Sequence, residues 1–199
     1  RLSFSVDSFL CCRKWRKAGA RFNGRPCHIP AALDRNGTVV HALLSGTYAG
    51  GSMDEVMARD YLAGRYWGAM DSNEEGFWNF ETMNLKGEQK DCAVYLSFWL
   101  FSPRSLVNLL LEPNMPRLDL EFAADDKLAV YVNGNLLDNA VKRQDNPALP
   151  QRIEGIPLEK GWNHVLLKVG QLWGGWNGRF RFTATDPAYM RQLESVIMQ

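Results

Sequence analysis

The sequence predicts an all-β, antiparallel protein with one inserted helix and a second helix at the C-terminus. Two observations predict this class. In the second half of the chain, short segments alternate polar and apolar residues, as strands with one buried face do. Turns rich in asparagine and glycine, such as Asn133-Gly134, separate these segments. With 199 residues and 46% hydrophobic content, the chain can bury the core of a single domain.

The clearest strand pair lies between residues 117 and 137. Its apolar positions are Leu118, Leu120 and Phe122 in the first segment and Leu128, Val130 and Val132 in the second. The segment Ala124-Asp125-Asp126-Lys127 breaks the alternation with turn-favouring residues, and Asn133-Gly134 suits the positive φ angles of a tight hairpin. We therefore predict two antiparallel strands, each with one buried face.

Further strands are predicted on both sides of this pair. The segments are 38–44, 92–103 with Val94, Leu96, Phe98 and Leu100 on one face, 163–169 with Val165, Leu167 and Val169, and 179–183 with Phe180 and Phe182. The third of them follows a Gly161-Trp162-Asn163 turn, and the last alternates its phenylalanines with arginines and a threonine. These patterns complete the all-β prediction.

Two segments have helical spacing. Between residues 45 and 85 strand alternation stops, and Ser52 to Glu55 has the spacing of a capping box ahead of an apolar stripe that can end at Gly64. Asp186-Pro187 is a good helix start. The apolar stripe that follows it consists of Met190, Leu193, Val196 and Ile197. We predict one sandwich domain over 1–185, with an inserted region at 45–85, and a C-terminal helix or linker over 186–199.

Composition argues against two kinds of partner. The 23 basic and 22 acidic residues nearly balance, and only the stretch 13–17 is strongly basic, so nucleic acid is not favoured as a partner. No apolar run approaches the roughly 20 residues that span a bilayer, and no membrane partner is expected.

One ordered set of motifs resembles a known family. It runs through Ala124-Asp125-Asp126, Val130 to Gly134, Gly161 to Val169, Gly174-Gly175-Trp176 and Phe180-Arg181-Phe182. This order is similar to the galactose-binding-domain-like jelly-roll β-sandwich, of the carbohydrate-binding-module type found in bacterial polysaccharide-degrading and surface proteins. The resemblance implies a jelly-roll sandwich within a larger multidomain protein, and an extracellular, periplasmic or cell-surface location. It also implies a non-catalytic role in binding polysaccharide or oligosaccharide.

Carbohydrate recognition needs aromatic rings for the C–H faces of the sugar and fixed polar groups for its hydroxyls. The candidate residues for this role are Trp67, Trp78, Asp71, Asn73, Glu74, Trp173 and Trp176. Loops on a rigid sandwich are where such residues are expected. The alternative for each tryptophan is packing in the core or at its rim. No cofactor is required, although a calcium ion held by loop oxygens around 71–75 is an open alternative.

Two other functions stay open at this point. The domain could be a structural sandwich that packs against a neighbouring domain of the same polypeptide, since fold does not imply function. It could also be a small polysaccharide-acting enzyme, but no motif in the sequence requires catalysis. The four cysteines, at 11, 12, 27 and 92, allow either a disulfide from the adjacent pair to Cys27 or Cys92, or buried thiols.

Overall fold

The computed structural model describes most of the second half of the chain and parts of the first. The described residues are 21–22, 25–26, 30–45, 48–49, 67–83, 92–107, 115–137, 142–143, 150–172 and 174–197. Two compact units are distinguished, residues 1–30 and residues 31–199. In the first unit, β1 (Arg21–Phe22) pairs with β2 (Arg25–Pro26) in an antiparallel hairpin. The predicted helix beginning at Ser52 lies outside the described residues.

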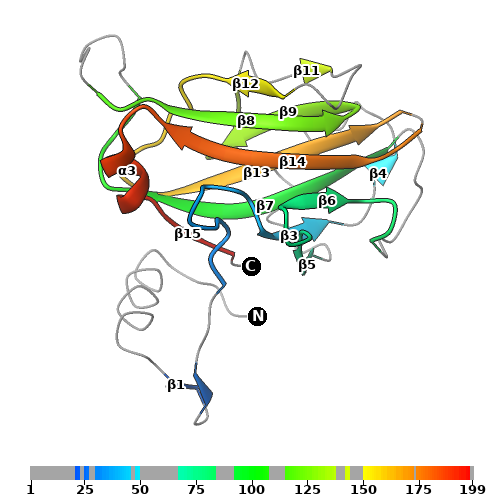
Figure 1. The fold of residues 1–199 in the computed structure, drawn as a ribbon, viewed down its shortest axis with the longest axis horizontal. Helices are drawn as coiled ribbons and strands as arrows, with labels where there is room; N and C mark the ends of the chain where they lie inside the picture. Colours follow the sequence, from blue (N-terminus) through cyan, green and yellow to red (C-terminus); the bar gives the residue numbers. More distant parts are fainter. Residues whose placement is uncertain are drawn as a thin grey trace. The chain divides into compact units, whose positions relative to one another are not determined.

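The second unit confirms the all-β sandwich, because its strands form two antiparallel sheets (Figure 1). In the larger sheet β10, β9, β13, β7, β3 and β5 lie in that order, with β11, β15 and β4 beside them. Their bounds are β3 His41–Ser45, β4 Tyr48–Ala49, β5 Trp67–Asp71, β7 Cys92–Ser102, β9 Lys127–Val132, β10 Asn135–Leu136, β11 Lys142–Arg143, β13 Gly161–Gln171 and β15 Glu194–Val196. β13 pairs along its whole length with β7, which makes these two strands the centre of the sheet.

The smaller sheet has four strands in the order β12, β8, β14 and β6. Their bounds are β6 Phe77–Asn79, β8 Leu118–Asp125, β12 Gln151–Ile153 and β14 Asn177–Ala184. Residues 37–39 continue the edge beyond β6, since the amide of Val39 donates to Phe180 O at 2.9 Å and that of Phe182 to Gly37 O at 2.8 Å. Gly37 has φ +81°, and a Cβ there would lie 2.2 Å from Phe182 O, so this close approach requires glycine.

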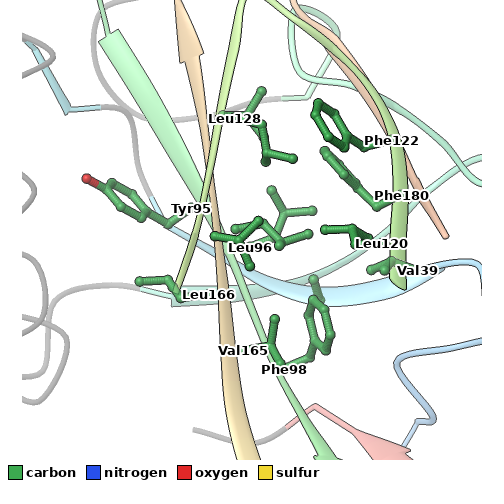
Figure 2. Close-up of a cluster of buried hydrophobic side chains, with 14 of the residues drawn as sticks. Val39, Tyr95, Leu96, Phe98, Leu120, Phe122, Leu128, Val165, Leu166 and Phe180 are labelled. Atoms are coloured by element: carbon green, nitrogen blue, oxygen red, sulfur yellow. The ribbon is translucent and has the colours of Figure 1, made fainter. Parts of the chain in front are cut away.

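The core lies between the two sheets and includes the apolar residues predicted from alternation. Figure 2 shows Leu96, Phe98 and Val165 of the larger sheet beside the side chains of the smaller one. Tyr95 and Leu166 point away from that layer, because successive side chains of a strand point to opposite faces of the sheet. Leu120 and Phe180, which the smaller sheet contributes, have no exposed surface. The hydrophobic free energy of the fold therefore comes chiefly from this interface between sheets.

The Asn133-Gly134 and Gly161-Trp162-Asn163 motifs meet in space. Asn133 and Gly134 have φ angles of 52° and 82°, as the predicted hairpin turn requires. The buried Asn163 side chain accepts from Asn133 Nδ2 at 3.0 Å and from the Glu159 amide at 2.8 Å. Its own amide group donates to Glu159 O at 2.8 Å and to Gly161 O at 3.0 Å. One fully hydrogen-bonded asparagine thus joins the two turns.

The predicted C-terminal helix is correct only in its first turns. α3 spans Pro187–Gln192, with the Asp186 carboxylate capping the Ala188 amide at 2.8 Å, and it lies at the end of β14 (Figure 1). The helical prediction is wrong beyond Gln192, because the chain becomes extended and β15 pairs with β7. Val196 and Ile197 are buried in the sandwich, so this segment is not a linker. Among the described residues, no helix is long and apolar enough to cross a membrane.

Candidate functional site

The outer face of the four-stranded sheet carries polar side chains from all four of its strands. Phe180 and Phe182 of β14 are fully buried, so the alternate positions Asn177, Arg179 and Arg181 lie on the opposite, outer face. The strand register then arranges the face in rows across the sheet. These rows are Arg152, Glu121 and Arg181; Ala123, Arg179 and Phe77; and Asp125, Asn177 and Asn79.

The last two rows combine an aromatic ring with amide and carboxyl groups. Phe77 is partly exposed and lies opposite Arg179. In the next row Asn177 lies between Asp125 on β8 and Asn79 on β6. Side chains directly opposite on neighbouring strands have Cβ atoms about 4.5–5.5 Å apart. We call Phe77, Asn79, Asp125, Asn177 and Arg179 the outer-face site.

A loop beside the site leaves space next to its polar groups. A Cβ at Gly175 would lie 3.4 Å from Asp125 Oδ2 and 3.7 Å from Asn177 Nδ2. The two side chains therefore converge on this glycine of the β13–β14 loop. The Asp126 carboxylate supports the same loop by accepting the Leu172 amide at 2.6 Å.

Asp125 has unusual electrostatics for a carboxyl group on a sheet face. Partial burial, together with the neighbouring Asp126 carboxyl, raises its pKa to about 6, and the charge of Glu81 adds to the shift. The folded protein therefore binds a proton at Asp125 more tightly than an unfolded chain does. That contribution to stability is fully present below about pH 4 and is lost as the pH rises through about 6.

Replacing Asp125 with asparagine should remove this pH dependence. Asparagine has nearly the shape of a protonated aspartic acid, so Asp125→Asn and the original chain should have similar stability near pH 4. As the pH rises to about 7, the variant should become the more stable protein, because only the original chain gains a desolvated negative charge. Urea unfolding at several pH values between these limits measures the difference. A constant difference would mean that the environment of Asp125 does not oppose ionisation.

Away from the outer-face site, the part of this face around Asp119 and Glu121 is held by ion pairs. Arg117 Nε donates to Asp119 Oδ1 at 2.9 Å, and the same carboxylate oxygen accepts the Gly155 amide at 3.0 Å. Arg152 donates to Glu121 and lies 3.7 Å from Asp119 Oδ2. The Asp119 side chain is almost completely buried, so these arginines neutralise a carboxylate that would otherwise be costly to bury. These ion pairs give this half of the face a structural role.

Two of the tryptophans predicted to contact a ligand are core residues instead. Trp78 and Trp176 have no exposed surface. Trp78 Nε1 donates to Val39 O at 2.9 Å, and both rings pack against Phe80, with centroids 6.4 Å and 5.4 Å from it. Their assignment as stacking platforms is wrong, because neither ring has a face that a sugar can reach. Both rings pack in the core, which was the alternative for each tryptophan.

The predicted polar residues around the β5–β6 loop differ in their contacts. Asp71 pairs with His41 Nδ1 at 2.5 Å across β3 and β5. Asn73 Oδ1 accepts the amides of Glu75 at 3.0 Å and Phe77 at 2.8 Å. Asn73 thus fixes the turn that delivers Phe77 to the outer-face site. Glu74 is exposed and makes no hydrogen bond or ion pair in the part of the chain that the structure describes.

The remaining predicted residues are only partly described. Trp67 is a residue of β5, but its side chain lies outside the described part, as does the whole of Trp173. A calcium site at 71–75 does not fit the arrangement there, because Asn73 Oδ1 already accepts two amides and Asp71 binds His41. No group of three metal-ligating side chains occurs among the residues described. Cys92 is buried at the start of β7, while the other cysteines lie outside the described residues.

One serine–histidine contact deserves comparison with a catalytic pair. Ser97 Oγ lies 2.9 Å from His164 Nε2 on the larger sheet. Burial lowers the pKa of His164 to about 4, so its imidazole is neutral at physiological pH and could in principle accept a proton. Ser97, however, has no exposed surface, and a substrate cannot reach its hydroxyl. The contact is part of the packing of the sheet.

Sequence reasoning missed most of the outer-face site, although its signal was present. Phe77 and Asn79 alternate along the strand with the buried Trp78 and Phe80, so they point to the opposite face. Asn177 is two residues before Arg179 and therefore points to the same face. The alternation in the sequence already puts Arg179 on the face opposite to the buried phenylalanines. Extending this alternation by a few residues on each strand would have located all four positions on one face.

Comparison with known proteins gives structural likenesses only. No family model matches the chain, and no curated protein matches it. Among solved structures, it is similar to a family 35 carbohydrate-binding module from an environmental isolate, with 15% identity and a TM-score of 0.37 over 66% of this chain and 89% of that one.

Two other solved structures illustrate the range of these likenesses. The A domain of epithelial adhesin 9 from Candida glabrata, in complex with Galβ1-3GlcNAc, has 13% identity and a TM-score of 0.43, covering 85% of this chain and 96% of that one. A β-glucosidase from Kluyveromyces marxianus, in complex with glucose, has 12% identity and a TM-score of 0.38 over 75% of this chain. This match covers only 16% of the β-glucosidase.

Proposed function

We propose that this chain binds carbohydrate without acting on it, and that the outer-face site makes the contact. The observation that carries the proposal is the position of Phe77, a partly exposed ring directly beside a row of two amides and one carboxyl group. A pyranose presents C–H groups on its face and hydroxyls at its edge. Phe77 can stack against the face, while Asn79, Asn177 and Asp125 can donate to and accept from the hydroxyls.

The Asn177 side chain of the site is available for such contacts. The Asn177 side-chain amide has no hydrogen-bond partner within the described residues, and it is partly exposed. The absence of a side chain at Gly175 leaves room beside it and beside Asp125. All five residues lie on strands of one sheet, so their positions are fixed before a ligand arrives, which lowers the entropic cost of binding.

Finer features of the function are part of the same proposal. The ligand is a polysaccharide or oligosaccharide, and the domain belongs to a larger secreted or surface protein, as the sequence resemblance implies. Trp67 and Trp173 remain candidate stacking residues, and Asp71 and Glu74 remain candidate hydrogen-bonding residues.

Replacing Phe77 with alanine tests the proposal. We expect Phe77→Ala to weaken binding to any glycan that the original chain binds by about tenfold or more, since central aromatic contacts dominate interfaces of this kind. A glycan array identifies the ligands, and affinity electrophoresis in gels containing the best polysaccharide measures the change.

A matched control separates loss of the ring from general damage. Val107 is the most exposed large apolar residue of those described, and it lies outside the smaller sheet. Val107→Ala should leave binding unchanged. The proposal is wrong if the array detects no ligand for the folded chain, or if Phe77→Ala binds as tightly as the original protein.

A further inference from the structure

Arg179 is an exposed cation at the centre of the outer-face site. It lies on β14 between Ala123 on one side and Phe77 on the other. Neither neighbour in its row carries a charge or a hydrogen-bonding side chain. Within the described part of the chain, the Arg179 guanidinium makes no ion pair and no hydrogen bond.

The other arginines of this face are placed differently. Arg117 is engaged by Asp119 and Glu154, and Arg152 by Glu121 and Asp119. Arg181 lies directly opposite Glu121 in the register. The face therefore supplies carboxylates to its structural arginines but none in the row of Arg179.

We infer that Arg179 binds an anionic substituent, a carboxylate or a sulfate, on a sugar that stacks against Phe77. The inference rests on the proposed function and specifies its ligand class as an acidic glycan. Phe77 and Arg179 are opposite each other in the register, so a substituent at the edge of a ring on Phe77 comes within reach of the guanidinium. The planar guanidinium can donate two parallel hydrogen bonds to such a group.

The neighbouring row agrees with this geometry. Asn177 is two residues before Arg179 on β14 and points to the same face, about 7 Å away along the strand. That separation is within reach of hydrogen bonds from substituents on opposite sides of one pyranose ring. A single sugar can therefore span Arg179 and Asn177 and use both, with its anionic group at one and a hydroxyl at the other.

The test uses matched pairs of acidic and neutral polysaccharides. Polygalacturonate and alginate are compared with their carboxyl-reduced forms, and dextran sulfate with dextran, by affinity electrophoresis and calorimetry on the full chain. We expect the original protein to bind at least one acidic member about tenfold more tightly than its neutral partner, because hydrogen bonds to charged groups are stronger than neutral ones. The carboxylated and sulfated pairs identify which anion is preferred.

Variants of Arg179 assign the preference to this side chain. Arg179→Gln should abolish the preference for the acidic member over its neutral partner, and Arg179→Lys should restore part of it. Arg191→Gln, which removes an exposed positive charge from α3 near the opposite end of β14, should have no effect. Added salt should reduce the preference in the original chain.

The outcomes distinguish this inference from the proposed function. If neutral and acidic members bind equally well and Phe77→Ala weakens both, the inference is overturned while carbohydrate binding stands. If Arg179→Gln keeps the full acidic preference, the anion lies elsewhere and the inference is also overturned. If the chain binds neither polysaccharide of any pair and the glycan array detects no ligand, the proposed function itself is wrong.

Discussion

Trp78→Ala is expected to lower the free energy of unfolding by about 3–5 kcal/mol, the range for removing a large buried aromatic side chain. Trp78 has no exposed surface, packs against Phe80 and donates its indole N–H to Val39 O at 2.9 Å. Alanine would leave a cavity and an unpaired carbonyl on the edge segment at 37–39. Urea unfolding followed by circular dichroism measures the change from the midpoint and slope.

The neighbouring residue supplies the matched control. Phe77 is adjacent in the sequence and also aromatic, but its side chain lies on the other face of β6. Phe77→Ala should therefore cost about 1 kcal/mol or less in stability, and its main effect should be on glycan binding. Equal destabilisation by the two substitutions would contradict the assignment of one ring to the core and the other to the surface.

Asn163→Ala is the second substitution with a large expected effect, a loss of about 3 kcal/mol or more in the free energy of unfolding. The buried Asn163 side chain makes four hydrogen bonds, two to the main chain of Glu159, one to Gly161 O and one to the Asn133 side chain. Alanine cannot replace any of these, so several buried polar groups would lose their partners.

Asn135→Ala is the control for this prediction. Asn135 is exposed on β10, and its only side-chain hydrogen bond within the described residues is a long one, 3.5 Å to Asn133 O. We expect a change of about 0.5 kcal/mol or less. If Asn163→Ala is as mild as Asn135→Ala, the asparagine does not hold the two turns together.

Much of the fold could be predicted from local patterns. Alternating residues such as Leu118, Leu120 and Phe122 have one face to bury, and the sandwich buries it. The Asn133-Gly134 pair specifies its turn through positive φ angles, which few other residue pairs tolerate. Such signals are local, so a single sequence is enough to read them.

The C-terminal segment could not be read in the same way. Met190, Leu193, Val196 and Ile197 have helical spacing, and the cap at Asp186 does start a helix. The end of that helix is decided by a distant partner. β7 offers hydrogen-bonding positions at Trp99 to Phe101, and pairing with them makes Glu194–Val196 a strand. Tertiary pairing of this kind overrides local helical preference.

The candidate site shows a related limit of sequence reasoning. Tryptophan and glycine-rich loops suggested stacking platforms, but tryptophan is also the largest core side chain, and composition alone does not separate the two uses. Trp176 lies just before β14, an even number of residues from Phe180. Its side chain therefore points to the same, core side of the strand and is buried. The register across β8, β14 and β6, which brings Asp125, Asn177 and Asn79 into one row, arises only on folding.

The most direct test of carbohydrate binding at the outer-face site is a nuclear magnetic resonance titration of the ¹⁵N-labelled chain with an oligosaccharide of the best glycan from the array. We predict that the largest shift changes occur at Phe77, Asn79, Asn177 and Arg179, with little change on the larger sheet around Trp99. Changes centred on the larger sheet, with the outer-face residues unmoved, would contradict the proposed site.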